Sequence, residues 1–295
     1  MFLHNYFNNN KNAKSLSKTS GTFEAGYDYW VEVLFERAMR LFVWKDTGKT
    51  PPKEIESTLM LNGTVGIAKY KNNLVAFNGA FGGAPTVYYD EFKKYNVYSP
   101  VYSASLDVDK NVVVMDNNAM RNSLYPLVHR YAIMLSHVEV SLVNTLINGR
   151  DSGGIPIAST EAQKQSIENY RNSLCNGKVS AILDPAFSGV QFLGINKNTT
   201  LQIKDLIEVR ENLLNSFYHD IGVKTAWNKK GNMIVQEVQA DEGMLLLNLS
   251  DMLNSRKIGA ENVNKMFGTK WSVDIAEEIR YTLNEKGDVE NVEQN

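Results

Sequence analysis

The chain has 295 residues, of which 43% are apolar or aromatic and 22% are charged, and its formal net charge is −2. A chain of this length and apolar content can bury a sizeable core, as one large domain or as two or three smaller lobes, and it lacks the composition of a disordered protein. Domains that bind nucleic acid through a basic face usually show a cationic excess, and this chain has none.

The single cysteine, Cys175, excludes an internal disulfide and is typical of a protein made in a reducing cytoplasm. A catalytic thiol would need a nearby base, and no histidine lies close to Cys175 in the sequence. No run approaches the ~18–20 continuous apolar residues of a membrane helix, so a membrane partner is not expected.

Both ends of the chain have the composition of solvated arms. Residues 1–24 are rich in Asn, Ser and Lys, lack the apolar core of a signal peptide, and carry Lys11, Lys14 and Lys18. Residues 285–295 are acidic. We expect a flexible basic arm and an acidic tail, and the three lysines are candidates for weak contacts with phosphates.

The first predicted helix is 25–45, where apolar residues recur with the i, i+3, i+4, i+7 spacing of an amphipathic helix. The stretch that ends it contains Gly48-Lys49-Thr50, which is the tail of a phosphate-binding loop. Val43 stands where that motif needs its first glycine, and Pro51-Pro52 follow it. Because a helix is expected before the motif instead of a strand, ATP binding is not predicted.

The next segment is β-like. Two hairpins are predicted, 64–70 with 73–78 around Lys71-Asn72, and 101–106 with 111–115. Short strands this close together predict a small barrel or sandwich packed on helices, and therefore an α+β fold. The glycine-rich 79–85 is expected to be a turn, because its spacing differs from a dinucleotide-binding fingerprint.

Two long helices are predicted in the middle of the chain. The first, 126–148, opens with a proline in its first turn and has a broad apolar face. The second, 199–221, is followed by a glycine that ends it. Residues 150–198 between them are predicted to form a separate compact insert with a strand, a helix and a strand: 155–158, 160–174 and 179–183.

Residues 223–242 are polar and unpatterned, and compact domains seldom carry so long a loop without a functional reason. Two helices, a strand and a last helix are predicted after it: 244–253, 255–267, 270–274 and 276–283. The four histidines are dispersed, and His129 and His137 are two helical turns apart, too far for one metal ion. We expect no metal site, no cofactor and no catalytic set, and so no enzyme.

Several short strings share their order and spacing with one known family. They are Leu41-Phe42-Val43-Trp44, Gly63-Thr64-Val65-Gly66, Asn78-Gly79-Ala80, Ser99-Pro100-Val101-Tyr102 and 112–120, with weaker matches at 155–157, 221–224, 255–256 and 263–268. No single string is specific. Because the strings occur in the same order and with the same spacing, the chain resembles the portal proteins, or upper-collar head–tail connectors, of Picovirinae-type short-tailed bacteriophages.

The resemblance implies a ring-forming phage portal fold with a β-rich wing, a stem of long helices and an α/β clip inserted between them. It divides the chain into a basic arm (1–24), a wing (25–125), a first stem helix (126–148) and a clip (149–198). After the clip come a second stem helix (199–222), a channel loop (223–242), a second part of the wing (243–284) and an acidic tail (285–295). The acidic tail is the only sequence left for a crown, and whether it forms one stays open.

The resemblance also implies a non-enzymatic function. A dodecameric homo-oligomer would sit at one capsid vertex and pass double-stranded DNA without sequence specificity during packaging and ejection. Its partners would be the major capsid protein, the packaging ATPase and the lower collar or tail proteins. It would reside in the virion after assembly in the host cytoplasm. The alternatives are another collar or adaptor ring of the virion and, less favoured, an enzyme.

The predicted channel loop carries the main candidate site. Lys229-Lys230 falls where the family has a lysine pair, and Lys224, Trp227 and Asn228 lie beside it. The resemblance implies that these residues face DNA, and the other interpretation is a solvated surface loop. A ring multiplies each lysine–phosphate contact, so a nearly neutral chain suits DNA that has to slide.

A second lysine ring is a weaker expectation. Lys197 and Lys204 lie near the junction of the clip and the second stem helix, but their match to the family's stem lysines is offset by about a residue. A solvent-facing role is equally open for both.

Overall fold

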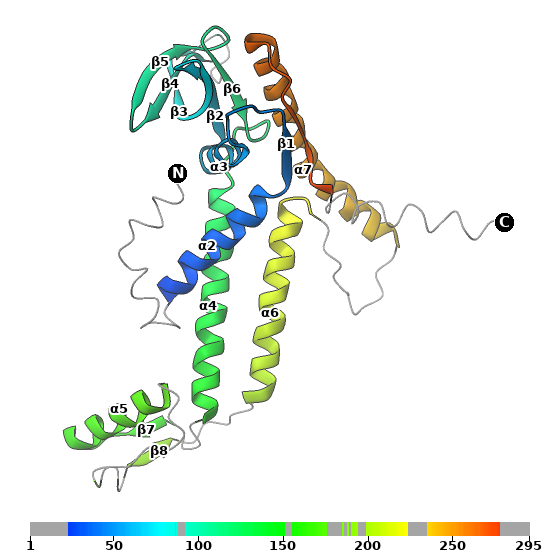
Figure 1. Cartoon of the computed structure of the whole chain (residues 1–295). Helices are drawn as coiled ribbons and strands as arrows, with labels where there is room; N and C mark the ends of the chain where they lie inside the picture. Colours follow the sequence, from blue (N-terminus) through cyan, green and yellow to red (C-terminus); the bar gives the residue numbers. More distant parts are fainter. Residues whose placement is uncertain are drawn as a thin grey trace, which may run out of the picture.

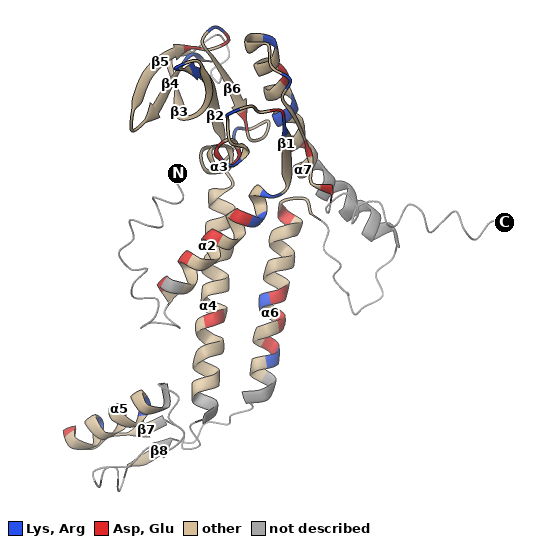
Figure 2. Ribbon diagram, viewed as in Figure 1, with Lys and Arg blue, Asp and Glu red and all other residues tan. Residues whose placement is uncertain are grey.

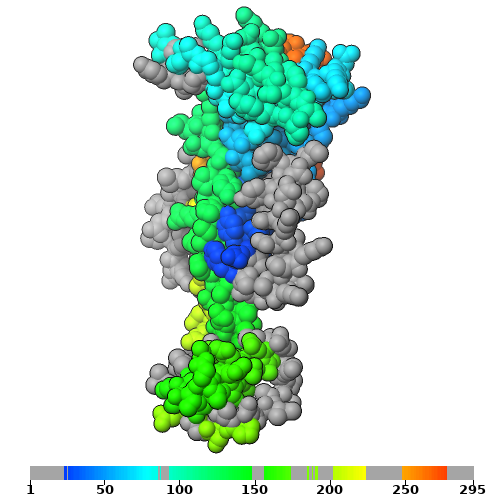
Figure 3. Space-filling view, turned by 90° about the vertical axis from the view of Figure 1, so that its left-hand side faces the viewer, coloured from blue at the N-terminus to red at the C-terminus, as the bar shows by residue number. Residues whose placement is uncertain are grey.

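The computed structural model describes residues 23–85, 92–150, 155–175, 190–193, 199–223 and 235–277, together with positions 87, 185 and 188. The molecule is elongated (Figures 1 and 3). Its elements are α2 (Phe23–Met39), β1 (Phe42–Lys45), α3 (Pro52–Asn62), β2 (Thr64–Tyr70), β3 (Asn73–Pro85), β4 (Phe92–Ser99), β5 (Tyr102–Asp107), β6 (Val112–Asp116), α4 (Tyr125–Arg150), β7 (Ile155–Ile157), α5 (Glu161–Cys175), β8 (Gln191–Leu193), α6 (Thr199–Asp220), α7 (Val235–Phe267) and β9 (Ser272–Ile275).

Three parts follow one another along the long axis. The α/β unit (β1–β6, α3, α7 and β9) lies at one end, and the distal unit (β7, α5 and β8) lies at the other. The shaft (α2, α4 and α6) joins them, with α4 leading away from the α/β unit and α6 returning antiparallel to it. The mixture of helices and strands confirms the predicted α+β class.

The first helix is shorter than predicted, because α2 ends at Met39 and Phe42–Lys45 is a strand. Phe42 and Trp44 are buried whereas Val43 and Lys45 are exposed, which is the period of two of a strand with one buried face. Over four residues this pattern also fits a helix. The partner strand that decides the matter, β9, comes from the far end of the chain.

Helix α3 was not predicted, although its end signals are present in the sequence. Pro52 stands in its first turn, and Gly63, with φ of 79°, ends it. From the sequence alone, the two prolines indicate only the end of the preceding helix. Ile55, Leu59 and Met60 form the buried face of α3 and add it to the core.

The five-stranded sheet has the order β5-β4-β3-β2-β6. The predicted hairpin of β2 and β3 is confirmed, and both of its turn residues, Lys71 and Asn72, have positive φ, as tight hairpins require. The second predicted hairpin is wrong, because β5 pairs with β4 and β6 pairs with β2. The two runs lie at opposite edges of the sheet, with the unpredicted β4 and the β2–β3 hairpin between them.

The glycine-rich 79–85 is also not a turn, because β3 continues through it to Pro85 and pairs with β4. Its glycines allow close packing. A Cβ on Gly79 would lie 2.4 Å from the Cε1 atom of the buried Tyr95 ring and 2.4 Å from the carbonyl oxygen of Asn96. The Tyr95 hydroxyl is 3.1 Å from the Thr64 hydroxyl, so the Tyr95 side chain of β4 extends past β3 and reaches β2.

The helices of the shaft and the distal unit begin and end close to where they were predicted. Helix α4 corresponds to the predicted helix 126–148, α6 to 199–221, and α5 to 160–174. In the distal unit, β7 pairs with β8 at Ile155–Ile157 and Gln191–Leu193. The predicted strand 179–183 lies outside the described residues.

Helix α7 is one continuous helix, where the end of a loop and two helices were predicted. Residues 235–242, expected in the loop, are helical, and no glycine or proline lies between Met244 and Ile258, where the break between two helices was expected. The predicted strand 270–274 is β9, shifted by one or two residues, and the predicted helix 276–283 falls almost entirely outside the described residues.

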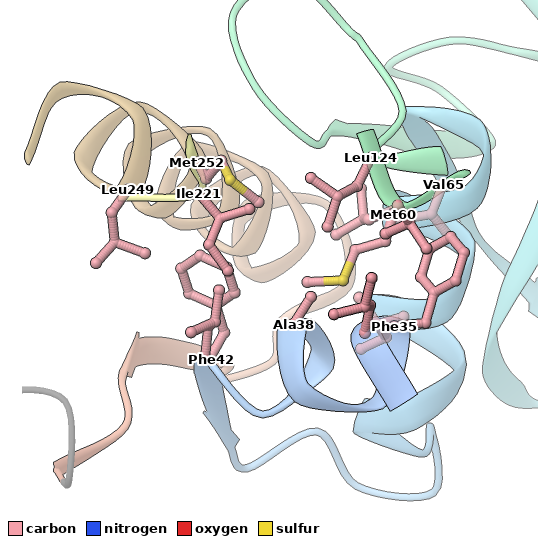
Figure 4. Close-up of a cluster of buried hydrophobic side chains, with 14 of the residues drawn as sticks. Phe35, Ala38, Phe42, Met60, Val65, Leu124, Ile221, Leu249 and Met252 are labelled. Carbon is pink, nitrogen blue, oxygen red and sulfur yellow. The ribbon is translucent and has the colours of Figure 1, made fainter. Parts of the chain in front are cut away.

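One core joins the α/β unit to the shaft. Figure 4 shows side chains from the helices and strands of both parts converging: Phe35, Ala38, Phe42, Met60, Val65, Leu124, Ile221, Leu249 and Met252. The ends of α4 and α6 are thus embedded in the same core as the sheet, so these parts pack as one body. None of the helices in the part of the chain that the structure describes is long and apolar enough to cross a membrane.

Candidate functional site

The candidate site is the junction of α6 and α7, where the predicted channel loop is attached. Helix α6 ends at Asp220, Gly222 turns the chain with φ of 85°, and the Val223 N–H donates to the Tyr218 carbonyl oxygen over 2.8 Å. Helix α7 begins at Val235. The predicted DNA-facing residues of this loop lie between these attachment points and outside the described residues: Lys224, Trp227, Asn228, Lys229 and Lys230.

Hydrogen bonds between helices hold the end of α6, where the predicted channel loop begins. The Tyr131 hydroxyl of α4 donates to the Asp220 carboxylate over 2.8 Å, and the Asn248 amide of α7 donates to the Asp220 carbonyl oxygen over 3.0 Å. Arg37 of α2 donates to the Tyr218 hydroxyl over 3.0 Å. Burial and the Asp220 carboxylate raise the pKa of Tyr131 to about 12, so this donor stays protonated at neutral pH.

The α/β unit beside this junction is organised around one buried ion pair. Arg256 of α7 is fully buried and donates to both carboxylate oxygens of Glu56 in α3, over 2.9 and 2.8 Å. It also donates to the carbonyl oxygens of Asn117 and Met252 and to the Asn117 side chain, over 2.9, 3.0 and 2.9 Å. These five bonds match the five N–H donors of a guanidinium group.

Strand β1 completes this network. The Trp44 indole N–H donates to the Glu56 carboxylate over 2.7 Å, and the guanidinium of Arg256 lies 4.0 Å from the centroid of the Phe42 ring. A buried charge pair is tolerated when its remaining donors and acceptors are satisfied, as they are here. The network thereby fixes β1, α3, α7 and the segment after β6 relative to one another.

The sequence indicates parts of this network but not the network itself. Phe42 with Trp44, Asn117 and Arg256 come from three of the strings that carry the family resemblance, and the fold brings them together. Glu56 was missed because it lies in the unpredicted α3. A carboxylate next to Ile55 on an apolar helix face was the available signal, but no spacing rule identifies a partner 200 residues away.

Glu139 lies in the middle of the shaft. A Cβ on Gly26 of α2 would lie 3.3 Å from its carboxylate, so α2 approaches α4 closely there. Burial raises the pKa of Glu139, and the indole of Trp30 and the charge of Arg210 lower it by less. Folding therefore raises the pKa of a carboxyl group inside the shaft.

The other predicted lysines are only partly described. Lys204 is exposed on α6 near the distal unit and makes no ion pair within the described residues. Lys197 and the arm residues Lys11, Lys14 and Lys18 lie outside the described residues. Of these lysines, Lys204 alone can therefore be placed.

The Gly48-Lys49-Thr50 stretch has a different setting from the one predicted, because it follows strand β1 and precedes helix α3. This order is that of a phosphate-binding loop, but the rest does not fit. Pro51 and Pro52 lack N–H groups at the start of α3, where such a loop presents donors to phosphate. The Thr50 hydroxyl donates to the Leu74 carbonyl oxygen over 2.8 Å.

The two histidines of α4 contact aromatic residues of α2. The Tyr27 hydroxyl lies 2.7 Å from His129 Nδ1, and the rings of Phe23 and His137 lie 4.6 Å apart between centroids. Across the described ranges, no three His, Cys, Asp or Glu side chains gather closely enough to hold a metal ion.

Residues 11–280 match the family model described as Phage Connector (GP10). A chain of the solved structure "Portal and tail of native bacteriophage P68" is 17% identical, with 94% of this chain and 97% of that chain covered and a TM-score of 0.44.

Two further solved structures are similar to this chain at 10% identity, with 97% of this chain and 91% of each matched chain covered. They are "Virion of native gene transfer agent (GTA) particle", with a TM-score of 0.39, and "Neck of empty GTA particle computed with C6 symmetry", with a TM-score of 0.41. The family match covers most of the chain and confirms the predicted resemblance. The chain belongs to the phage connector family, and it is a portal, or head–tail connector, protein of a bacteriophage.

Proposed function

We propose that the chain forms a closed, dodecameric ring at one vertex of the capsid, through which double-stranded DNA enters during packaging and leaves during ejection. The ring is structural and not an enzyme, and a separate packaging ATPase supplies the energy. The major capsid protein and the lower collar or tail proteins bind its outer surfaces. It assembles in the host cytoplasm and stays in the virion. Membership of the connector family supports this proposal.

The architecture supports the same assignment of parts. In the proposed ring the α/β unit is the wing, the shaft is the stem and the distal unit is the clip. Two long antiparallel helices, α4 and α6, connect the wing to the clip, and the predicted channel loop leaves α6 at the end that is embedded in the wing core. Such a stem can line a channel while the units at its two ends meet different partners.

Membership of the connector family is the observation that carries the ring. Leu146 of α4 and Ile207 and Val209 of α6 are 46%, 36% and 44% exposed. Single exposed apolar residues also occur on monomers, but in a ring the stems of neighbouring subunits would cover these three. A head-to-tail contact of this kind closes a ring when the rotation between copies allows it.

We propose that Lys229 and Lys230, with Lys224, Trp227 and Asn228, face the DNA in this channel, and that Lys204 with Lys197 forms a second ring of charge. The lysines of residues 1–24 would make further weak contacts with phosphates. These contacts act on the backbone of the duplex and not on its bases, so they guide DNA of any sequence. Their small number per subunit suits a duplex that has to slide.

The oligomeric state tests the ring, and genome packaging tests the loop. Native mass spectrometry of the full chain, with negative-stain images of the same sample, should give a closed ring with a central opening. The double variant Lys229→Ala and Lys230→Ala should form this ring but alter packaging or retention of the genome. The matched control is Lys53→Ala with Lys257→Ala, two exposed lysines of the wing. Packaging and retention like the control's would refute the loop assignment.

A further inference from the structure

The shaft and the α/β unit differ in their balance of charge (Figure 2). Helices α2, α4 and α6 of the shaft carry five Lys or Arg and nine Asp or Glu. The described residues 40–85, 92–124 and 235–277 of the α/β unit carry fourteen Lys or Arg and thirteen Asp or Glu. The shaft is therefore acidic and the α/β unit is nearly neutral, so a positive surface on that unit depends on where its lysines lie.

Turns from separate segments bring lysines to one edge of the α/β unit. The register pairs Ala68 of β2 with Val112 of β6, so the β2–β3 turn with Lys71 lies beside the β5–β6 turn with Lys110. Lys69 places its ammonium group 5.6 Å from the centroid of the Phe267 ring, which brings the last turn of α7 to the same edge.

A fourth segment reaches this edge through Thr50, which donates to the carbonyl oxygen of Leu74, the residue opposite Lys69 in the hairpin. We define the lysine patch as the exposed residues Lys49, Lys69, Lys71, Lys110 and Lys265.

The lysine patch is not neutralised by the chain itself. None of its five lysines forms an ion pair within the part of the chain that the structure describes; the described ion pairs lie elsewhere. Asp46 and Asp109 occupy two of the same turns and offset part of the charge. A net positive surface formed by side chains on long flexible stems is left at this edge.

We propose that the lysine patch binds the phosphate backbone of double-stranded DNA on the outside of the ring, separately from the channel. This inference goes beyond the proposed channel, because it needs no threading of DNA. Lysine acts as a point charge toward phosphates, and contacts of this kind hold a duplex without reading its bases. The patch contains no arginine, whereas the cores of protein interfaces are enriched in arginine and aromatic residues and depleted of lysine.

The aromatic rings at the edge favour duplex over single-stranded DNA. Proteins that bind single strands stack bases on free aromatic faces. Here the ammonium group of Lys71 lies 5.2 Å from the Tyr70 centroid and that of Lys69 lies 5.6 Å from the Phe267 centroid, so a lysine covers one face of each ring. These two described rings therefore add charge at this edge more than they add a stacking surface.

Closed circular duplex DNA separates this surface from the channel, because it cannot thread through a closed ring. The test variant of the full chain is Lys71→Gln, Lys110→Gln and Lys265→Gln, and the control is Arg130→Gln, Lys164→Gln and Arg171→Gln on the shaft and distal unit. Removing three phosphate contacts should lower the slope of log affinity against log salt by about 2.7, and affinity near 0.1 M salt by roughly 100-fold or more. The control should stay within about twofold of wild type.

A charge-conserving variant, Lys71→Arg, Lys110→Arg and Lys265→Arg, should keep the affinity, which separates loss of charge from loss of folding. Equal affinity and slope for the test variant and wild type would overturn the proposal. So would displacement of circular DNA by polyglutamate of equal charge as effectively as by duplex DNA, because that result assigns the patch to an acidic protein. A ring that threads linear DNA while the test variant binds circles normally would refute the patch and leave the channel intact.

Discussion

Replacing Arg256 by methionine should destabilise the wing severely, because it removes one partner of a buried ion pair. Arg256 is fully buried and the Glu56 side chain is 3% exposed, so water cannot take over the lost bonds. The Glu56 carboxylate would keep only the indole N–H of Trp44, and the Asn117 carbonyl and side-chain oxygens would each lose the bond that they accept from the guanidinium. The loss is thus a charge left uncompensated in the core.

The expected cost is large on the scale of single substitutions. Breaking a buried pair by removing one partner costs about 3–5 kcal/mol in the free energy of unfolding. For folded units of this size, about 1 kcal/mol shifts the unfolding temperature by roughly 2–4 °C, so Arg256→Met should lower it by roughly 6–20 °C. Lys164→Met removes an exposed pair with Glu161, with side chains 58% and 84% exposed, and should cost less than about 0.5 kcal/mol.

A double-mutant comparison separates the charge from the packing. Glu56→Gln combined with Arg256→Met leaves a neutral amide in place of the carboxylate, so this double variant should be more stable than Arg256→Met alone. Urea unfolding and thermal unfolding followed by circular dichroism measure both effects. The reasoning is refuted if Arg256→Met lies within about 1 kcal/mol of wild type, or if the double variant gains nothing over the single one.

Gly63 and Gly268 have similar positive φ, 79° and 69°, but a Cβ at Gly63 would lie 2.0 Å from a backbone carbonyl oxygen, whereas at Gly268 it would meet open space. Gly63→Ala should therefore cost at least about 2 kcal/mol more than Gly268→Ala in urea unfolding, and equal losses would contradict this. Tyr131→Phe should cost about 1 kcal/mol by removing the donor to Asp220. Because the pKa of Tyr131 rises from 10.0 to about 12 on folding, wild type should lose stability between these pH values and the variant should lose less; parallel pH profiles would count against it. Glu139→Gln should stabilise the fold at about pH 7 but not at about pH 4. Because folding raises the pKa of Glu139, the wild type loses stability as the pH rises through the titration of this carboxyl group. The same difference in melting temperature at both pH values would be inconsistent with the burial of Glu139.

Local patterns in the sequence determined the limits of three of the described helices. The apolar periodicity and the end signals placed α4, α5 and α6 within a few residues, and a two-residue turn placed the β2–β3 hairpin. These elements are long or closed by a tight turn, so their own residues decide their structure.

The errors arose where a distant partner decides the structure. Phe42–Lys45 is a strand because β9 pairs with it, and 79–85 is a strand because β4 packs its glycines against Tyr95. The Arg256–Glu56 pair joins two helices far apart in sequence for the same reason. The predicted DNA-facing loop follows from the family resemblance alone, since no periodicity or spacing marks a lysine as facing a channel.

The oligomeric state of the purified full chain tests the central claim most directly. Native mass spectrometry, with single-particle images of the same sample, should show a closed ring of about twelve copies with the α4 and α6 helices around an opening wide enough for duplex DNA. A chain that remains a monomer or dimer at high concentration, with Leu146, Ile207 and Val209 still exposed to solvent, would contradict the account.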